Sequence, residues 1–374
     1  MPRPDLRLLL LLAAIGCGHS DPFRPADNSG TGPFDSTPPL QLTLNVGQDR
    51  DPLWLPDGSG VLYAFQRLDR VDRDQCFGVV PAGGGTRRRE KCYADDGSRD
   101  TTNLFRDEAM SAGGRLAWVA EATTIGRLDP VSAGIRIGTL DPADRGIEVR
   151  SLPYLAPNGA VHSTATHLGW LGEDALVYVG TDVAYAAACN GCPPDTLLAG
   201  KDVALLNLAN VPATVTILPG TGEATAVWPA PDASAIYFTR RGDSQVYRQA
   251  PVGGAVTVIH DFGAGRIARD PQVIGTRLVA IVDGVVDTVV VALFGTAQVD
   301  SGGRVASVDL GSGLETLLPI ATLLFRRPAL SPSGQQIVAE GYPLVITPIF
   351  DSLGQVIRLD STITSVADLR LLEP

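Results

Sequence analysis

The sequence predicts an all-β protein built as a closed ring of six four-stranded units, a six-bladed β-propeller. The main observation is a repeat in which a short apolar strand ends in a turn and a second apolar strand follows. The clearest copies are Leu53–Tyr63, Val227–Phe238 and Ala329–Ala339. The composition agrees with this class, because 41 Gly and 28 Pro in 374 residues indicate many turns, and a hydrophobic content of 44% is enough for a large core.

Six copies of the repeat are found when the first apolar residue after each turn is marked. These residues are Val61, Leu116, Leu176, Ile236, Leu278 and Ile337, and successive ones lie 55, 60, 60, 42 and 59 positions apart. Units of this length have room for four short strands, and self-similarity at such a period is typical of propeller blades. The turns of the clear copies contain Pro, Asp, Gly or Ser, which favour tight returns.

A second hairpin follows the first in two of the units. Cys76–Val80 and Val246–Ala250 are each followed by a turn that contains Pro and Gly, and then by a return strand. Two hairpins in the same order in two separate segments indicate one repeated four-stranded unit.

The two ends of the propeller segment are predicted to close the ring. Val366–Leu372 supplies the third strand of the sixth unit, which then lacks its outer strand. Leu40–Val46 alternates apolar and polar residues and corresponds to Ala213–Leu218, the strand that precedes the fourth unit. Pairing the first strand with the last hides both sheet edges, which a ring requires. We therefore expect the propeller over residues 40–374.

These repeats resemble the TolB-type, WD-like β-propeller repeats, and six copies imply a six-bladed ring. The resemblance covers the repeats and not full-length TolB, whose family carries an α/β domain before its propeller. The partner contacts of TolB are therefore not carried over to this chain. Relatives of prolyl oligopeptidase also carry such propellers together with an α/β-hydrolase domain, and no such domain is expected after the sixth unit here.

The N-terminus has the features of an export signal. Arg3 and Arg7 form a positive region before an apolar stretch, Leu8–Ile15, that is too short to span a bilayer. Ala14–Cys17 resembles the lipobox of bacterial lipoproteins, which implies cleavage before Cys17 and attachment of diacylglycerol to its thiol. Ala14 stands where the lipobox usually has Leu, and ordinary secretion with cleavage at a nearby small residue is the alternative.

The resemblance to a lipobox implies that the N-terminal region consists of two segments. Residues 1–16 are expected to be the lipoprotein signal peptide, and residues 17–39, rich in Pro, Gly and Asp, a flexible tether. The protein is then expected to be exported and lipid-anchored in the bacterial cell envelope, at the outer membrane and facing the periplasm or the cell surface.

Four cysteines remain beyond Cys17. Cys76 and Cys92 are equidistant from Gly84, the centre of a hairpin turn, so an antiparallel ladder places them opposite each other and predicts a disulfide. Cys189 and Cys192 enclose an Asn-Gly pair, which favours a tight loop closed by a second disulfide. A redox or metal role for this second pair is the alternative.

One set of polar residues is predicted to meet at the channel mouth. These are the residues three positions before Trp54 and its counterparts, where the chain enters the innermost strand of each unit: Asp51, Asp107, His167, Thr225, Asp270 and Arg327. Because all innermost strands start at one rim, their side chains should form a polar ring. The ring either caps turns and holds channel water, or it binds a cation or a basic ligand group.

Other polar or apolar groups give weaker signals. Asp69, Asp72 and Asp74 suggest calcium, but interleaved arginines and the missing Gly and Glu of an EF-hand favour a solvated loop. His162 and His167 form a weak zinc pair. An apolar insertion in the sixth unit contains Tyr342, Leu344, Val345, Ile349 and Phe350. It either forms a partner surface or packs under the rim, and we expect the second.

No familiar catalytic motif is present. The sequence lacks the nucleophile elbow, the zinc-protease helix motif, the phosphate-binding loop and the dinucleotide fingerprint, and it has only four His. A net charge of −11 disfavours binding to nucleic acid. We expect a non-enzymatic, monomeric binding or scaffold protein without metal or cofactor, whose partner is an envelope protein, peptide or glycan. The alternative is a lactonase- or lyase-type enzyme that uses the channel ring, although Arg327 would be costly inside a divalent-metal site.

Overall fold

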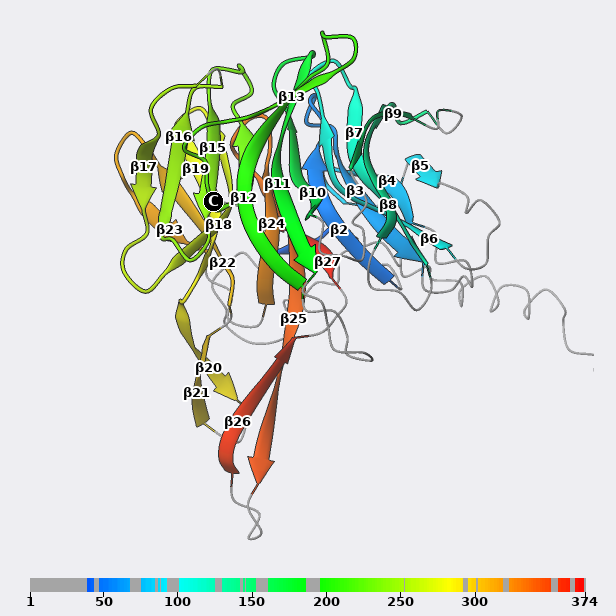
Figure 1. The fold of residues 1–374 in the computed structure, drawn as a ribbon. Coiled ribbons are helices and arrows are strands. Elements are labelled where there is room, and N and C mark those ends of the chain that lie inside the picture. The colour runs from blue at the N-terminus through cyan, green and yellow to red at the C-terminus, as the bar shows by residue number, and fades with distance from the viewer. Residues whose placement is uncertain are drawn as a thin grey trace, which may run out of the picture.

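The computed structural model is a ring of six antiparallel sheets around a central channel (Figure 1). It describes residues 39–43, 47–67, 75–84, 87, 89–92, 101–124, 130–141, 144, 146–152, 161–185, 196–251, 253–291, 295–300, 302–318, 323–350, 356–363 and 367–372. The predicted fold class, an all-β six-bladed propeller of four-stranded blades, is confirmed. Among these residues, no helix is long and apolar enough to cross a membrane.

In the first five blades the strands follow one another in chain order from the channel outward, and blade six takes its outer strand from the N-terminal end. Blade one contains β2 (Gly47–Trp54), β3 (Gly60–Arg67), β4 (Gln75–Pro81) and β5 (Arg89–Cys92). Blade two contains β6 (Thr101–Met110), β7 (Leu116–Thr124), β8 (Pro130–Gly138) and β9 (Ile147–Leu152). Blade three contains β10 (Val161–Trp170), β11 (Ala175–Tyr185), β12 (Thr196–Asn207) and β13 (Thr214–Ile217).

The second half of the chain repeats this order with two additions. Blade four contains β14 (Ala224–Pro229), β15 (Ile236–Arg240), β16 (Gln245–Gln249) and β17 (Thr257–Asp261). Blade five contains β18 (Ile267–Ile274), β19 (Arg277–Asp283), β22 (Arg304–Asp309) and β23 (Glu315–Leu317). Blade six contains β24 (Leu323–Leu330), β25 (Ile337–Phe350), β27 (Asp368–Leu372) and β1 (Leu40–Gln41). The additions are β20 (Val286–Val291) with β21 (Gly295–Asp300), and β26 (Val356–Ile363).

The hydrophobic core lies between neighbouring blades. Among the described residues, six large clusters of buried side chains each join one blade to the next, and the last of these joins blade six to blade one. In that cluster Leu369 packs with Trp54 and Tyr63, which come from the opposite end of the chain. Each fully buried Leu, Val or Phe contributes about 1.5–3 kcal/mol, so the blade interfaces stabilise the ring as a whole.

The ring is closed by the N-terminal strand, as predicted. Leu40 pairs with Leu371 and Gln41 with Arg370, so β1 forms the outer strand of blade six. Beyond β1 the Leu42 N–H donates to the Leu369 carbonyl at 2.8 Å. The predicted closing strand ran to Val46, whereas β1 ends at Gln41 and residues 44–46 lie outside the described part of the chain.

Two hairpins extend from the ring on the same side (Figure 1). One is β20–β21, inserted between the second and third strands of blade five, which the sequence did not reveal. The other is formed by β26 and the far half of β25, where Leu344 pairs with Ile363 and Phe350 with Val356. The expectation that this apolar insertion packs under the rim is met by Tyr342, which is buried with Leu324 and Ala367. It does not hold for the backbone from Leu344 onward, because the long pairing of β25 with β26 carries that part away from the blade.

The predicted cysteine pair meets in register. Cys76 of β4, which is buried, stands directly opposite Cys92 of β5. The disulfide itself remains a prediction, and Cys17, Cys189 and Cys192 lie outside the described residues.

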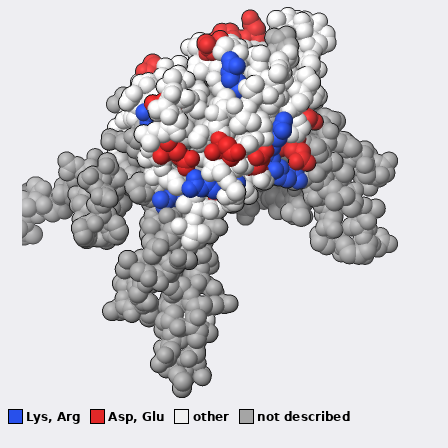
Figure 2. Space-filling view, turned by 90° about the vertical axis from the view of Figure 1, so that its left-hand side faces the viewer, with Lys and Arg blue, Asp and Glu red and all other residues white. Residues whose placement is uncertain are grey.

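Charge is mixed on the side of the molecule shown in Figure 2. Acidic side chains form a band across this face, with basic side chains beside and below it. Among the described ion pairs, Glu315 of β23 lies 2.7 Å from Arg266 and 3.3 Å from His260.

Candidate functional site

Each innermost strand contains an irregularity that shapes the channel. Its ladder with the second strand skips at this point in all six blades, which is the signature of a β-bulge. In five blades the bulged residue has a positive φ: Asp51, Asp107, His167, Asp270 and Arg327, with values of 47–55°. These are five of the six residues predicted for the polar ring.

The predicted place of the ring along the strands was wrong. Asp51 is the fifth residue of β2 and Arg327 the fifth of β24, so the ring lies within the strands, at their bulges, and not at their first residues. The sequence alignment did not show where the innermost strands begin. In the structure they begin several residues before the ring positions. Thr225 also departs from the set: its φ is not positive, and its hydroxyl pairs with the Thr239 hydroxyl at 3.0 Å.

The ring carboxylates connect one blade to the next through the bulged backbone. Asp51 Oδ2 accepts the N–H of Asp107 at 3.3 Å, and Asp107 Oδ1 accepts the N–H of His167 at 2.7 Å. Farther around the ring, Asp270 Oδ2 accepts the N–H of Arg327 at 3.2 Å. A left-handed backbone is unfavourable for most residues, and these bonds hold it in place while joining neighbouring blades.

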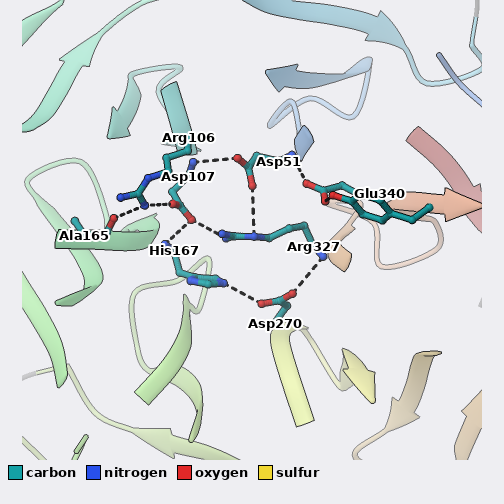
Figure 3. A network of polar contacts seen from close by, with 9 residues as sticks. Asp51, Arg106, Asp107, Ala165, His167, Asp270, Arg327 and Glu340 are labelled. Atoms are coloured by element: carbon teal, nitrogen blue, oxygen red, sulfur yellow. Dashed lines mark hydrogen bonds and ion pairs between the residues drawn. The ribbon is translucent and has the colours of Figure 1, made fainter. Parts of the chain in front are cut away.

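Arg327 lies across the channel between the acidic residues of the ring (Figure 3). Its Nη1 lies 2.7 Å from Asp107 Oδ1, and its Nε lies 3.4 Å from Asp51 Oδ1. His167 Nε2 lies 2.9 Å from Asp270 Oδ1. Arg106 reaches the outer side of Asp107, with Nη1 at 2.7 Å from Oδ2. The chain thus supplies its own cation at the place where a bound cation or basic group was predicted.

Burial and charge divide the ring carboxyl groups into two classes. Burial alone would raise the pKa of Asp107, but Arg327 and Arg106 outweigh it and lower that pKa below its ordinary value. The pKa of Asp270 is likewise lowered, against burial, by the hydrogen bond from His167 and the charge of Arg327. For Asp51 burial dominates and raises the pKa, although Arg327 opposes it.

Two glutamates that the sequence analysis did not single out complete this environment. Glu340 of β25 is buried, accepts the Asp51 N–H at 2.7 Å through Oε1, and accepts the Tyr342 hydroxyl at 2.7 Å through Oε2. Burial and the nearby Asp51 raise its pKa to about 7. Glu108, next to Asp107, is also buried, and burial and Asp51 raise its pKa well above its ordinary value.

Beside the ring lies a small polar cavity of about 60 Å³. All six blades contribute to it the residue that follows the bulge: Pro52, Glu108, Leu168, Ala226, Pro271 and Pro328. Five of these residues are apolar, and Glu108 is the exception. Neither carboxyl oxygen of Glu108 has a hydrogen-bond partner among the described residues, and the same holds for His167 Nδ1 and Trp228 Nε1.

The cavity continues into a wider apolar funnel of about 290 Å³. The two spaces share the lining residues Leu53, Leu168, Trp228 and Gln272. The funnel opens at the turns between the first and second strands, and its wall contains three tryptophans, Met110 and several prolines. Trp54 Nε1 donates to the Ala329 carbonyl at 2.9 Å and Trp170 Nε1 to the Ala109 carbonyl at 3.1 Å, so two of the tryptophans are fixed across blade boundaries.

The remaining predicted sites fall outside the part of the chain that the structure describes. Asp69, Asp72 and Asp74 lie outside the described residues, and so does the side chain of His162. Within the described part of the chain, no three His, Cys, Asp or Glu side chains are arranged to hold a metal ion. A signal for Glu108 was available, because aligning the residue after each ring position shows one acid among apolar residues and prolines.

Comparison with known proteins shows similarity of fold. No family model matches the chain, and no curated protein matches it. TolB from Acinetobacter baumannii is 17% identical, with a TM-score of 0.46 over 87% of this chain and 65% of that chain. A protein described as TolB from Agrobacterium tumefaciens is 14% identical, with a TM-score of 0.43 over 74% and 82%.

A third similar structure belongs to an enzyme. Oligogalacturonate lyase in complex with manganese is 11% identical, with a TM-score of 0.47 over 90% of this chain and 92% of that chain. The chain thus spans less than two thirds of the first TolB structure. The six-bladed ring predicted from the repeats is established by the sheets of this structure itself. These likenesses, all with TM-scores below 0.5, do not bear on the function of the chain.

Proposed function

We propose that this protein is a monomeric, non-enzymatic binding protein that receives an apolar segment of a protein or peptide partner in the channel funnel. The observation that carries this proposal is the funnel wall. Every blade contributes apolar side chains to it, including Trp54, Met110, Trp170, Ile274 and Leu330. Its volume of about 290 Å³ lies just below the range of ligand pockets, about 300–1,000 Å³.

The polar groups of the funnel favour a peptide over a glycan. Gln272 Oε1 accepts the Leu330 N–H at 2.7 Å, and Ser111 Oγ accepts the Arg115 N–H at 3.0 Å. Recognition of a glycan needs several side chains that can bond to its hydroxyl groups, and these two are engaged within the protein. An apolar peptide side chain needs none and gains by leaving water.

The ring gives little support to the enzymatic alternative. A lactonase or lyase at the channel would need carboxylates that can reach a substrate or a metal ion. Asp51, Asp107 and Asp270 instead bond to the backbone of the next blade, to His167 or to Arg327. If these three carboxylates turned to a substrate or a metal ion, the guanidinium of Arg327 would remain without a partner. A buried charge without a partner is strongly unfavourable.

The proposal also includes the location of the protein in the cell envelope. The lipobox-like Ala14–Cys17 supports lipid attachment at Cys17, and the tether over residues 17–39 supports a propeller held at some distance from the outer membrane, on its periplasmic or surface side. Such a placement gives the funnel access to envelope partners.

Site-specific photo-crosslinking in the native cells tests the funnel. A benzophenone amino acid at Ile274, on the funnel wall, should give a discrete adduct, whereas the same group at the exposed Thr216 of β13 should not. Met110→Asp should abolish the adduct because it places a charge in the apolar wall, and Thr216→Asp serves as the matched control. Equal crosslinking from both positions, or an adduct that survives Met110→Asp, would refute the funnel as the binding site.

A further inference from the structure

The N-terminal strand β1 joins the propeller at the height of the funnel. Pairing across blade six places one residue of each strand in a single row, which contains Leu40, Leu371, Val338 and Ala329. Ala329, at the inner end of this row, belongs to the funnel wall. The point where the tether meets the ring therefore lies on the outer edge of a blade whose inner edge forms part of the funnel.

The chain before Leu40 continues toward the mouth of the funnel. Because β1 is antiparallel to β27, positions before Leu40 extend in the direction of Leu372, the last residue of β27. Leu372 shares its row with Ile337 and Leu330, the last row before the turn between β24 and β25. That turn contains Pro332 of the funnel wall. The tether thus meets the ring on the face where the funnel opens.

The distance from β1 to the funnel wall is within reach of the nearest part of the tether. Three strand spacings separate β1 from β24, and at about 4.8 Å each they amount to about 14 Å. Phe34 precedes Leu40 by six positions, and six residues can extend over about 20 Å. The side chain of Phe34 can therefore reach the funnel without any change in the ring.

Phe34 also has the chemistry that the funnel wall favours. Of residues 18–38, only Phe23 and Phe34 have large apolar side chains, and both lie outside the described part of the chain. The funnel wall includes Met110 and Trp170. An aromatic ring gains by leaving water, and contacts with a thioether or an indole add to that gain.

The shorter connection favours Phe34 over Phe23. Phe23 lies seventeen positions before Leu40. Since the probability of closing a chain falls with about the 3/2 power of its length, Phe34 has an effective concentration at the funnel about fivefold higher. Short connections give effective concentrations in the millimolar range, so even a weak contact is populated.

We infer that the funnel binds a segment of its own chain when no partner is present, with the ring of Phe34 against the apolar wall at Met110 and Trp170. The inference rests on the proposed function, because it takes the funnel to be a receptor for apolar groups. A partner segment must then displace Phe34. The tether competes with the partner and lowers its apparent affinity by the fraction of funnels that are occupied.

Photo-crosslinking within the purified protein tests the contact. A benzophenone amino acid at position 34 replaces one aromatic side chain by another. Illumination should join the segment around position 34 to the peptide that contains Met110, within one molecule, as identified by mass spectrometry. The same group at position 23 should give this product in about fivefold lower yield, and Met110→Asp should abolish the product from position 34.

Competition with the partner in native cells gives a second readout. With the benzophenone at Ile274, Phe34→Ser should raise the yield of the partner adduct by about twofold or more, because a contact that is at least half populated withholds half of the funnels. Phe34→Trp should keep the yield of the wild type. Phe23→Ser removes the other aromatic residue of the tether and is the matched control, with a smaller effect than Phe34→Ser.

The outcomes separate this inference from the proposed function. A product from position 34 that does not involve the funnel wall, or an equal partner adduct at Ile274 in Phe34→Ser and the wild type, would overturn the contact, while that adduct would still support partner binding. If position 34 joins the Met110 peptide but Ile274 gives no partner adduct, the contact stands and the proposed function fails. Products that join two molecules would place the tether of a second copy in the funnel and overturn the inference.

Discussion

Replacing Glu340 by Gln should make the protein more stable at neutral pH and leave it nearly unchanged in acid. Glu340 is buried at the back of the ring, where its carboxyl group accepts hydrogen bonds from the Asp51 N–H and the Tyr342 hydroxyl. A glutamine oxygen can accept the first bond and its amide can donate to the Tyr342 oxygen. The substitution therefore keeps the contacts and removes only the ionisation.

The size of the effect follows from the shift of the Glu340 pKa. Its pKa rises from an ordinary value of 4.5 to about 7 in the folded protein, because burial and Asp51 disfavour the charged form. A raised pKa gives stability that is complete below pH 4.5 and lost as the pH rises toward 7. At about 1.36 kcal/mol per pH unit, the loss approaches about 3 kcal/mol. Glu340→Gln should not lose stability in this way, because glutamine does not ionise.

Urea unfolding followed by tryptophan fluorescence measures the difference at each pH. The free energy of unfolding of Glu340→Gln minus that of the wild type should rise from near zero at pH 4 to about 3 kcal/mol at pH 8. Glu223→Gln, at an exposed position, should give a flat difference. A difference that does not change with pH, or a variant less stable than the wild type at pH 8, would refute the assigned environment of Glu340.

Four other predictions concern the ring, the lipid anchor, the disulfide and the closing strand. Arg327→Met should lower stability at pH 7 by about 3–5 kcal/mol and by less at pH 4, because the ring carboxyl groups of the variant are no longer held ionised by Arg327 and can accept protons in acid; equal losses in urea unfolding at both pH values would contradict the network. Cys17→Ser should move the protein from the membrane to the soluble fraction, and unchanged retention would exclude the lipid anchor. A non-reduced peptide map should contain Cys76 linked to Cys92, and two free thiols in the exported protein would rule out this bond. Deleting residues 40–46 should lower the melting temperature and cause light scattering, since each buried Leu or Val contributes about 1.5–3 kcal/mol; the same melting curve as a tether deletion would exclude this closure.

The sequence predicted well what depends on local periodicity. Val61, Ile236 and Ile337 mark second strands in the structure because apolar residues at strand spacing, after a turn with special backbone requirements, have few alternative folds. The closing strand was also predictable, since an unpaired last blade requires a partner. The β20–β21 hairpin was missed because an inserted hairpin lengthens one connection without disturbing the repeat around it.

The candidate site was predicted only in part, because the alignment of repeats gives the positions of residues around the ring but not the directions of their side chains. Aligning the copies placed Asp51, Asp107 and Asp270 in one ring, since equivalent positions of a repeat meet around its axis. The alignment did not show that Arg327 lies across the channel, because side-chain direction depends on the left-handed bulge and on the partners it meets. Glu108 escaped notice because an acid beside an acid has no distinctive pattern in sequence.

The sequence by itself determined the architecture of this protein: the number of blades, the strands within each blade and the closure of the ring all follow from short-range patterns repeated along the chain. The tertiary structure alone decided what the channel contains. Ring closure brings residues from all six blades around one axis, with Asp51 and Arg327 in ion-pair contact although they are far apart in the chain. Burial there sets which carboxyl groups are paired with Arg327 and which, such as Glu108, have a raised pKa. These properties depend on distance and solvent exclusion in three dimensions, which no local sequence pattern encodes.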